Sequence, residues 1–95
     1  MASSVHPLLL DVREREEFTG EFGHIAGSVL IPLKELSARV GELESYKDKE
    51  IIVICRAGVR STTAAALLTG LGFEHVANLK GGMVEWDDQK LPVER

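Results

Sequence analysis

One cysteine stands among residues that could turn its thiol into an anionic nucleophile. Cys55 directly follows the apolar run at residues 51–54 and opens the segment CRAGVRS. Two residues of this segment, Arg56 and Arg60, are cationic. Positive charge close to a thiol stabilises the thiolate, which is the form that attacks electrophiles. The spacing therefore predicts a sulfur nucleophile beside a binding place for a small anion.

The backbone of the same segment adds to this prediction. Gly58 gives the loop the freedom to point several N–H groups inward, as in anion-binding nests. A helix is expected to begin at or near Ser61, and its N-terminus carries a partial positive charge. In an open parallel sheet, ligands bind beyond the carboxyl ends of the strands, and Cys55 falls at such an end. Loop and helix are thus expected to hold an anion next to Cys55.

A plainer interpretation of the same residues is structural. A cysteine at the end of an apolar strand is often a small buried hydrophobic residue. Gly58 then only shapes a turn, and Arg56 and Arg60 are solvated loop charges. The coincidence of strand end, glycine, two arginines and helix start favours function, but these residues alone leave both interpretations open.

Length and composition describe an ordinary globular protein. The chain has 95 residues, of which 44% are hydrophobic and 27% charged, so we expect one domain spanning residues 1–95. The net charge of −4 and the lack of a basic patch argue against a nucleic-acid partner. The apolar runs are too short to span a membrane, and no secretory signal is visible, so we expect a cytoplasmic protein without a membrane partner. A single cysteine excludes an internal disulfide and a CxxC redox pair.

Short apolar segments alternate with helical patterns along the chain. The nearly continuous apolar run at residues 8–12 predicts a strand, and the all-apolar run at residues 51–54 is typical of a strand buried on both faces of a parallel sheet. A second short strand is expected at residues 28–31, and a strand with a weaker pattern at residues 75–79. A turn or short helix is expected at residues 14–19, and helices at residues 61–71, capped by Ser61 or Thr62, at residues 83–89, and from Pro32 through Leu33, Leu36, Val40 and Leu43. This order predicts an α/β domain with a mostly parallel sheet.

Charged residues are also expected at the end of the first strand. Asp11 and Arg13 fall on the same side of the sheet as Cys55. They either support the active-site pocket or form a structural ion pair that fixes the loops, and we favour the ion pair. The three histidines share no metal-ligand spacing, so no metal site is expected. His24, among glycines, is expected to be a turn residue that bonds the backbone.

The segment at residues 55–61 resembles the active-site loop of rhodanese-like sulfurtransferases. Three further blocks resemble the family's signatures in the family's order: LLDVR with Glu17-Phe18, GHIAGS running to Ile31-Pro32, and GGM with Trp86 followed by LPV. The resemblance implies a rhodanese-like fold, a mostly parallel four- or five-stranded sheet flanked by helices on both faces. The family usually has another strand first, but only seven residues precede Leu8. We therefore expect that edge strand to be missing, shortened or formed by residues 2–6, unless the chain is a domain cut from a larger protein.

The resemblance also implies an activity and a set of site residues. Cys55 would take a sulfane sulfur from thiosulfate or a persulfide donor and pass it to a thiol, cyanide or a partner protein. The substrate-binding loop would be formed by Arg56, Ala57, Gly58, Val59, Arg60 and Ser61. The expected partners are a small anionic sulfur donor and a sulfur-acceptor protein. No cofactor is implied, because the Cys55 persulfide is itself the covalent intermediate.

Two other functions remain alternatives to sulfur transfer. Phosphatases and arsenate reductases that share this fold have one residue more between the cysteine and the arginine of their loop. Here four residues separate Cys55 from Arg60, and the smaller loop suits a single sulfur atom better than a phosphate. The second alternative is a non-catalytic binding module, which we disfavour because inactive relatives commonly lose the cysteine.

Overall fold

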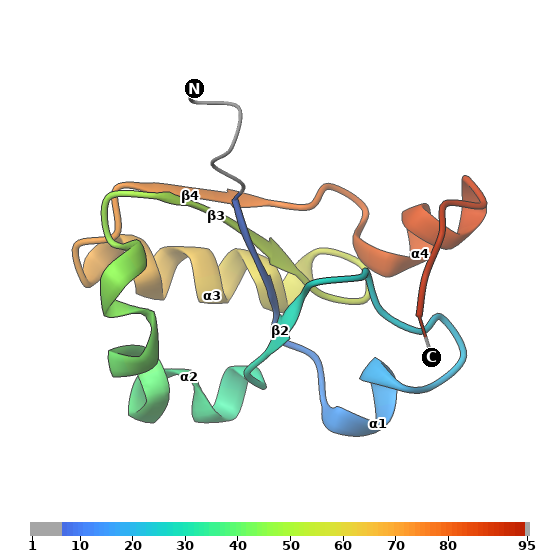
Figure 1. Cartoon of the computed structure of the whole chain (residues 1–95), viewed down its shortest axis with the longest axis horizontal. Coiled ribbons are helices and arrows are strands. Elements are labelled where there is room, and N and C mark those ends of the chain that lie inside the picture. The colour runs from blue at the N-terminus through green and yellow to red at the C-terminus, as the bar shows by residue number, and fades with distance from the viewer. Residues whose placement is uncertain (1–6, 95) are drawn as a thin grey trace.

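Strands and helices alternate along residues 7–94, the part of the chain that the computed structural model describes (Figure 1). The elements, in chain order, are β1 (Leu8–Asp11), α1 (Arg15–Phe18), β2 (Val29–Leu30), α2 (Leu33–Arg39), the 3₁₀ helix η2 (Val40–Tyr46), β3 (Glu50–Ile54), α3 (Val59–Gly70), β4 (His75–Asn78) and α4 (Gly82–Asp88). The expectation that residues 2–6 supply an edge strand lies outside the described residues. Within the described part, no helix is long and apolar enough to cross a membrane.

The four strands form one parallel sheet in the order β2-β1-β3-β4. The register of the two central strands runs from Leu8 beside Ile51 to Asp11 beside Ile54, so both strands end at the same level. The N–H of Val12 continues the ladder by donating to the carbonyl of Ile54 at 2.9 Å. Because all strands point the same way, the segments that follow them meet at one edge of the sheet. The predicted α/β fold with its parallel sheet is confirmed.

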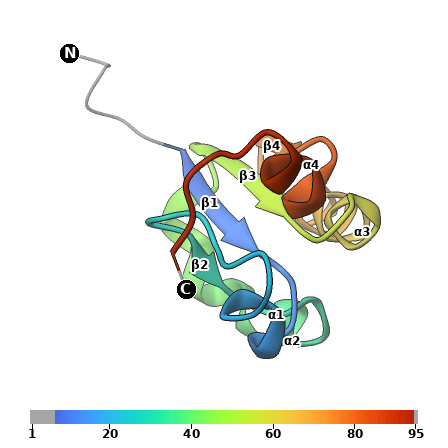
Figure 2. The ribbon, with the colours of Figure 1, turned by 90° about the vertical axis from the view of Figure 1, so that its right-hand side faces the viewer.

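The main core lies between one face of the sheet and the helices α2, η2 and α3. Leu10 and Val53 on the central strands are completely buried, as are Leu36 of α2 and Leu68 of α3. Figure 2 shows α2 and α3 on the same side of the sheet, and the two helices contact each other. Burying an aliphatic side chain of this size contributes about 1.5–3 kcal/mol. The apolar runs that predicted the strands therefore also anchor the helices.

The helix expected from Pro32 is shorter than its apolar pattern suggested. The α-helical part ends at Arg39, and the chain continues as the 3₁₀ helix η2. Gly41 stands directly after this change, and glycine costs about 1 kcal/mol in an α-helix relative to alanine. Leu43 is nevertheless buried in the main core, so the tighter helix preserves the apolar contact that the spacing predicted.

At the carboxyl edge of the sheet, α1 follows β1 and α4 follows β4 (Figure 1). Met83 of α4 is completely buried. Trp86 donates its indole N–H to the carbonyl of Pro92 at 3.0 Å and so attaches the C-terminal segment to α4. The two helices thus flank the loop that follows β3, which carries the cysteine.

Candidate active site

The loop after β3 turns sharply into α3. Cys55 is the first residue beyond the strand, and Gly58 precedes the helix with a φ of 103°, a conformation that L side chains rarely adopt. The helix therefore begins at Val59, two residues earlier than predicted. Ser61 and Thr62 do not cap it, which corrects the expectation. Their hydroxyls lie inside the first turn and donate back to the carbonyl of Gly58 at 3.2 and 2.8 Å.

The thiol of Cys55 lies inside this turn and is almost completely buried. The N–H of Gly58 donates to Sγ at 2.9 Å, and Ser61 Oγ lies 3.4 Å from it. Burial by itself would raise the pKa of the thiol. The Ser61 hydroxyl and the N–H groups of Ser61, Gly58 and Ala57 outweigh burial, so that the pKa of Cys55 lies below its ordinary value. The arrangement favours a thiolate, as the sequence predicted.

The N-terminus of α4 is hydrogen-bonded to the backbone of the same loop. The N–H groups of Met83 and Val84 donate to the carbonyls of Cys55 and Arg56, each at 2.9 Å. Gly82 has a φ of 59°, and a Cβ there would collide with the same two carbonyl oxygens. Sequence analysis included Gly82 only as part of the GGM block. The signal that pointed to this contact was the Gly-Gly pair immediately before a helix.

The positive charge of Arg60 is paired with a carboxylate. Its guanidinium forms a bidentate ion pair with the carboxylate of Glu17 in α1, with N–O distances of 2.5 and 2.8 Å. This hydrogen-bonded pairing lowers the pKa of Glu17 to about 2. The anion-binding role predicted for Arg60 stays a prediction, but its charge is already matched by a carboxylate. Sequence reasoning missed Glu17 because its partner lies 43 residues away.

Arg56 is the other cation of the loop, and its side chain is exposed. Its guanidinium lies over the ring of Phe22, 5.4 Å from the ring centroid, a cation–π contact of about 0.5–1 kcal/mol at an exposed position. None of the ion pairs found within residues 7–94 includes Arg56. Ala57 is exposed as well, and Val59 is 77% exposed. The structure thus leaves the side chains of Arg56, Ala57 and Val59 exposed to solvent.

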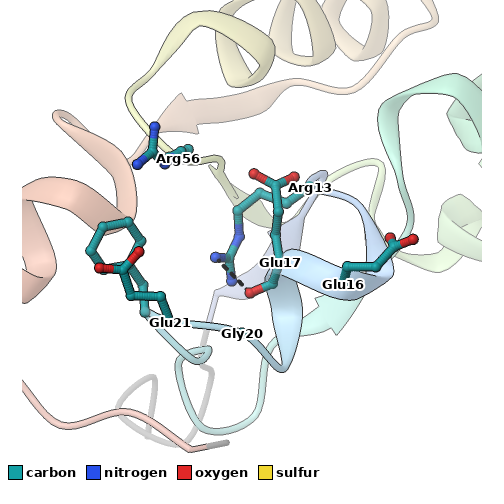
Figure 3. A pocket seen from close by; sticks show the side chains of 7 residues that line it. Arg13, Glu16, Glu17, Gly20, Glu21 and Arg56 are labelled. Atoms are coloured by element: carbon teal, nitrogen blue, oxygen red, sulfur yellow. Dashed lines mark hydrogen bonds between the residues drawn. The ribbon is translucent and has the colours of Figure 1, made fainter.

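A cavity of about 230 Å³ opens beside this loop (Figure 3). Figure 3 shows Arg56 on one side of it and Arg13 and Glu17 on the other. Its lining comes from the segment between β1 and α1, from α1 and the turn after it, and from the loop after β3. It consists of Arg13, Glu16, Glu17, Gly20, Glu21, Phe22 and Arg56. The cavity is large enough for a small sulfur compound and carries charged groups of both signs.

Asp11 and Arg13 form a buried ion pair below this cavity. Arg13 Nη2 lies 2.7 Å from Asp11 Oδ2, and both side chains are at most 1% exposed. The same guanidinium donates to the backbone carbonyls of Gly23 at 2.8 Å and Glu17 at 3.2 Å. These contacts join the end of β1 to α1 and the following turn. They agree with the structural interpretation, in which the pair fixes the loops around the site.

His24 is engaged by the backbone, as its glycine neighbours suggested. Its Nδ1 lies 2.8 Å from the carbonyl oxygen of Phe18, and the two rings stack with centroids 3.8 Å apart. Backbone bonds also pair His24 with Glu94 in an isolated bridge. Among the residues that the structure describes, no three His, Cys, Asp or Glu side chains gather in a way that could hold a metal ion.

The structure places the thiol at the N-terminus of a helix, beyond the carboxyl ends of the strands of a parallel sheet. This arrangement defines the class of the protein, an α/β domain that presents one cysteine at that edge of the sheet. Residues 1–89 match the model of the rhodanese-like domain family. The chain belongs to this family, which confirms the resemblance seen in its sequence blocks.

Relatives and solved structures agree with this assignment. The uncharacterized protein YibN of Escherichia coli strain K12 is 40% identical over 89 residues, covering 93% of this chain and 61% of YibN. A sulfurtransferase of Allochromatium vinosum is 32% identical over 93 residues, covering 98% of this chain and 83% of that protein. The crystal structure of the rhodanese-like domain of the Alr3790 protein from Anabaena matches with a TM-score of 0.82 and 33% identity, covering 95% of this chain and all of that domain. The chain spans about three fifths of YibN, and a single domain over residues 1–95 stays a prediction.

Proposed function

We propose that this chain is a sulfurtransferase in which Cys55 takes up a sulfane sulfur from thiosulfate or a persulfide donor and passes it to a nucleophilic acceptor. The observation that carries the proposal is the hydrogen bond of 2.9 Å from the Gly58 N–H to Cys55 Sγ, at the N-terminus of α3. A thiol that accepts such bonds is stabilised as the thiolate, and the pKa of Cys55 is lowered accordingly. The naming of the Allochromatium relative supports the same chemistry.

The first step is a nucleophilic attack on the outer sulfur of the donor. The Cys55 thiolate forms a new S–S bond, while the S–S bond of the donor breaks. The donor leaves with the bonding electron pair, as sulfite from thiosulfate or as a thiolate from a persulfide. With thiosulfate, Cys55 is left as a persulfide whose outer sulfur carries the negative charge, and with a protonated persulfide donor the proton stays on that sulfur until it is lost to solvent. The N–H groups that stabilise the thiolate are placed to stabilise this anion too.

The second step returns Cys55 to the thiolate. A thiolate or cyanide attacks the outer sulfur, and Cys55 leaves with the electron pair of the S–S bond. The products are an acceptor persulfide or thiocyanate. The chain has one cysteine only, so an internal disulfide cannot consume the persulfide. The sulfur must therefore leave to another molecule, which we propose to be a thiol or a sulfur-acceptor protein.

Thiocyanate release tests this proposal. The protein is given thiosulfate or a low-molecular-weight persulfide together with cyanide, and thiocyanate is measured against donor concentration. We expect turnover with double-displacement kinetics, and in Cys55→Ser only the uncatalysed rate measured without protein. Hydrolysis of an aryl phosphate, with no thiocyanate from either donor above that uncatalysed rate, would instead support the phosphatase alternative and overturn sulfur transfer.

A further inference from the structure

The ion pair between Arg60 and Glu17 changes the charge that a sulfur donor meets. Arg60 stands in the first turn of α3, which is the turn that carries Ser61 and holds the Cys55 thiol. Two bonds of 2.5 and 2.8 Å join its guanidinium to the Glu17 carboxylate. Opposite charges at this separation largely cancel each other's field at a third group several ångströms away. Within residues 7–94 no ion pair includes the other cation of the loop, Arg56, so the loop presents one guanidinium outside an ion pair rather than two.

Glu17 is fixed in this position by its own backbone and side-chain contacts. Its Oε1 also accepts the N–H of Glu14 at 2.9 Å, in the capping box of α1. Arg13, held by Asp11, donates to the backbone carbonyl of Glu17 at 3.2 Å. The pKa of Glu17 is lowered to about 2, mainly by the hydrogen bond from Arg60, so the carboxylate stays ionised at every physiological pH.

The remaining lining of the cavity does not restore the positive charge. Arg13 is matched by Asp11 in the buried pair. The other charged residues that line the cavity, Glu16 and Glu21, are both acidic. A doubly charged anion such as thiosulfate thus meets a surface with little net attraction. A persulfide of a thiol carries at most one negative charge on its reacting sulfurs, so the pairing of Arg60 with Glu17 reduces its attraction to the site less.

From this arrangement we propose that Glu17 is a specificity-determining residue: by pairing with Arg60 it directs the Cys55 site toward thiol persulfides and away from thiosulfate. The inference rests on the proposed sulfur transfer and adds the class of donor to it. In the favoured step, the Cys55 thiolate attacks the outer sulfur of R–S–SH, the S–S bond of the donor breaks, and RS⁻ leaves. The proton remains on the outer sulfur, so charge and atoms balance.

The test is the rate at which each donor loads Cys55 in a single turnover. Two donors are compared by intact mass, thiosulfate and the persulfide of 2-mercaptoethanol, which is uncharged outside its sulfurs. Glu17→Gln removes the charge while keeping an oxygen that accepts from Arg60 and from Glu14. We expect this variant to load from thiosulfate roughly 3- to 10-fold faster, the size of effect typical of a partly exposed charge, while loading from the persulfide changes less than about 2-fold.

A matched control variant is Glu35→Gln. Glu35 also pairs with arginines, Arg15 and Arg39, and its pKa is likewise about 2, but it belongs to α2 and does not line the cavity. Its replacement should leave the ratio of the two loading rates unchanged. If Glu17→Gln slows both donors in parallel, or leaves the ratio as it is, Glu17 is only structural and the inference is wrong. Loading by neither donor in the unmodified protein would overturn the proposed function itself.

Discussion

Arg13 and Asp11 form a completely buried ion pair in which Nε and Nη2 of the guanidinium donate to the two carboxylate oxygens, at 2.9 and 2.7 Å. Asp11 ends β1 and pairs with Ile54, the last residue of β3, so the ion pair lies at the same edge of the sheet as Cys55. Because Arg13 also bonds the backbone of α1 and of the following turn, it orients the wall of the cavity opposite Arg56.

Removing Arg13 should therefore cost far more stability than removing an exposed arginine. In Arg13→Met the Asp11 carboxylate is left buried without a partner, and we expect a loss of about 3–5 kcal/mol in the free energy of unfolding. Arg15→Met breaks an ion pair in which the Arg15 side chain is 60% exposed, and should change the free energy of unfolding far less. Urea denaturation measures both. Equal losses would mean that the buried pair does not fix the loops.

Ser61 should control the reactivity of the thiol. Its Oγ lies 3.4 Å from Cys55 Sγ, and among the groups that lower the pKa of Cys55 its hydroxyl has the largest effect. In Ser61→Ala we expect the pKa of Cys55 to rise and alkylation by iodoacetamide at neutral pH to slow several-fold. The measurement is the alkylation rate as a function of pH. Thr62→Ala, which loses a bond to the same Gly58 carbonyl but none to Sγ, should leave that profile in place.

The close approach of α4 to the cysteine loop can be tested at Gly82. An added methyl group there would meet the carbonyl oxygens of Cys55 and Arg56, at a φ that alanine rarely adopts. We expect Gly82→Ala to destabilise the fold by about 1–3 kcal/mol and to slow sulfur loading, because the loop must shift. Gly70→Ala is the matched control, since nothing lies within 4 Å of its added Cβ, and it should be neutral or stabilising by up to about 1 kcal/mol. Similar urea midpoints for both variants would contradict the close approach of Gly82 to the carbonyls of the cysteine loop.

The Glu17–Arg60 pair predicts a specific loss of stability in acid. The pKa of Glu17 falls from an ordinary value of 4.5 to about 2 on folding. A carboxyl whose pKa is lowered stabilises the folded state above its unfolded pKa, and this contribution disappears as the pH falls through the folded pKa. Between about pH 4.5 and pH 2, the unmodified protein should therefore lose more stability than Glu17→Gln. Urea unfolding at a series of pH values measures this difference, and parallel curves for the two proteins would refute it.

The fold was predictable from sequence where burial alone decides the structure. The runs around Leu10 and Val53 are apolar because both strands are covered, and their pattern is visible without knowledge of the rest of the chain. The end of α2 was not predictable in this way. Leu43 keeps the spacing of a continuous helix, while the change to 3₁₀ geometry depends on local backbone preference around Gly41.

The candidate site was predictable as far as it depends on neighbours in sequence. Cys55, Gly58 and Ser61 lie within one turn, so their mutual contacts follow from the loop and the helix start. The partner of Arg60 could not be found from spacing, because Glu17 reaches it only after β1 and β3 have aligned α1 with α3. A count of charges in the loop alone therefore leaves out the carboxylate that pairs with Arg60.

The central claim is that Cys55 carries the transferred sulfur, and intact mass after incubation with a sulfur donor tests it most directly. The account predicts a gain of one sulfur atom in the unmodified protein, lost again on adding cyanide, and no gain in Cys55→Ser. A protein that acquires no sulfur from thiosulfate or from a thiol persulfide, or a Cys55→Ser variant that acquires it equally, would contradict the account.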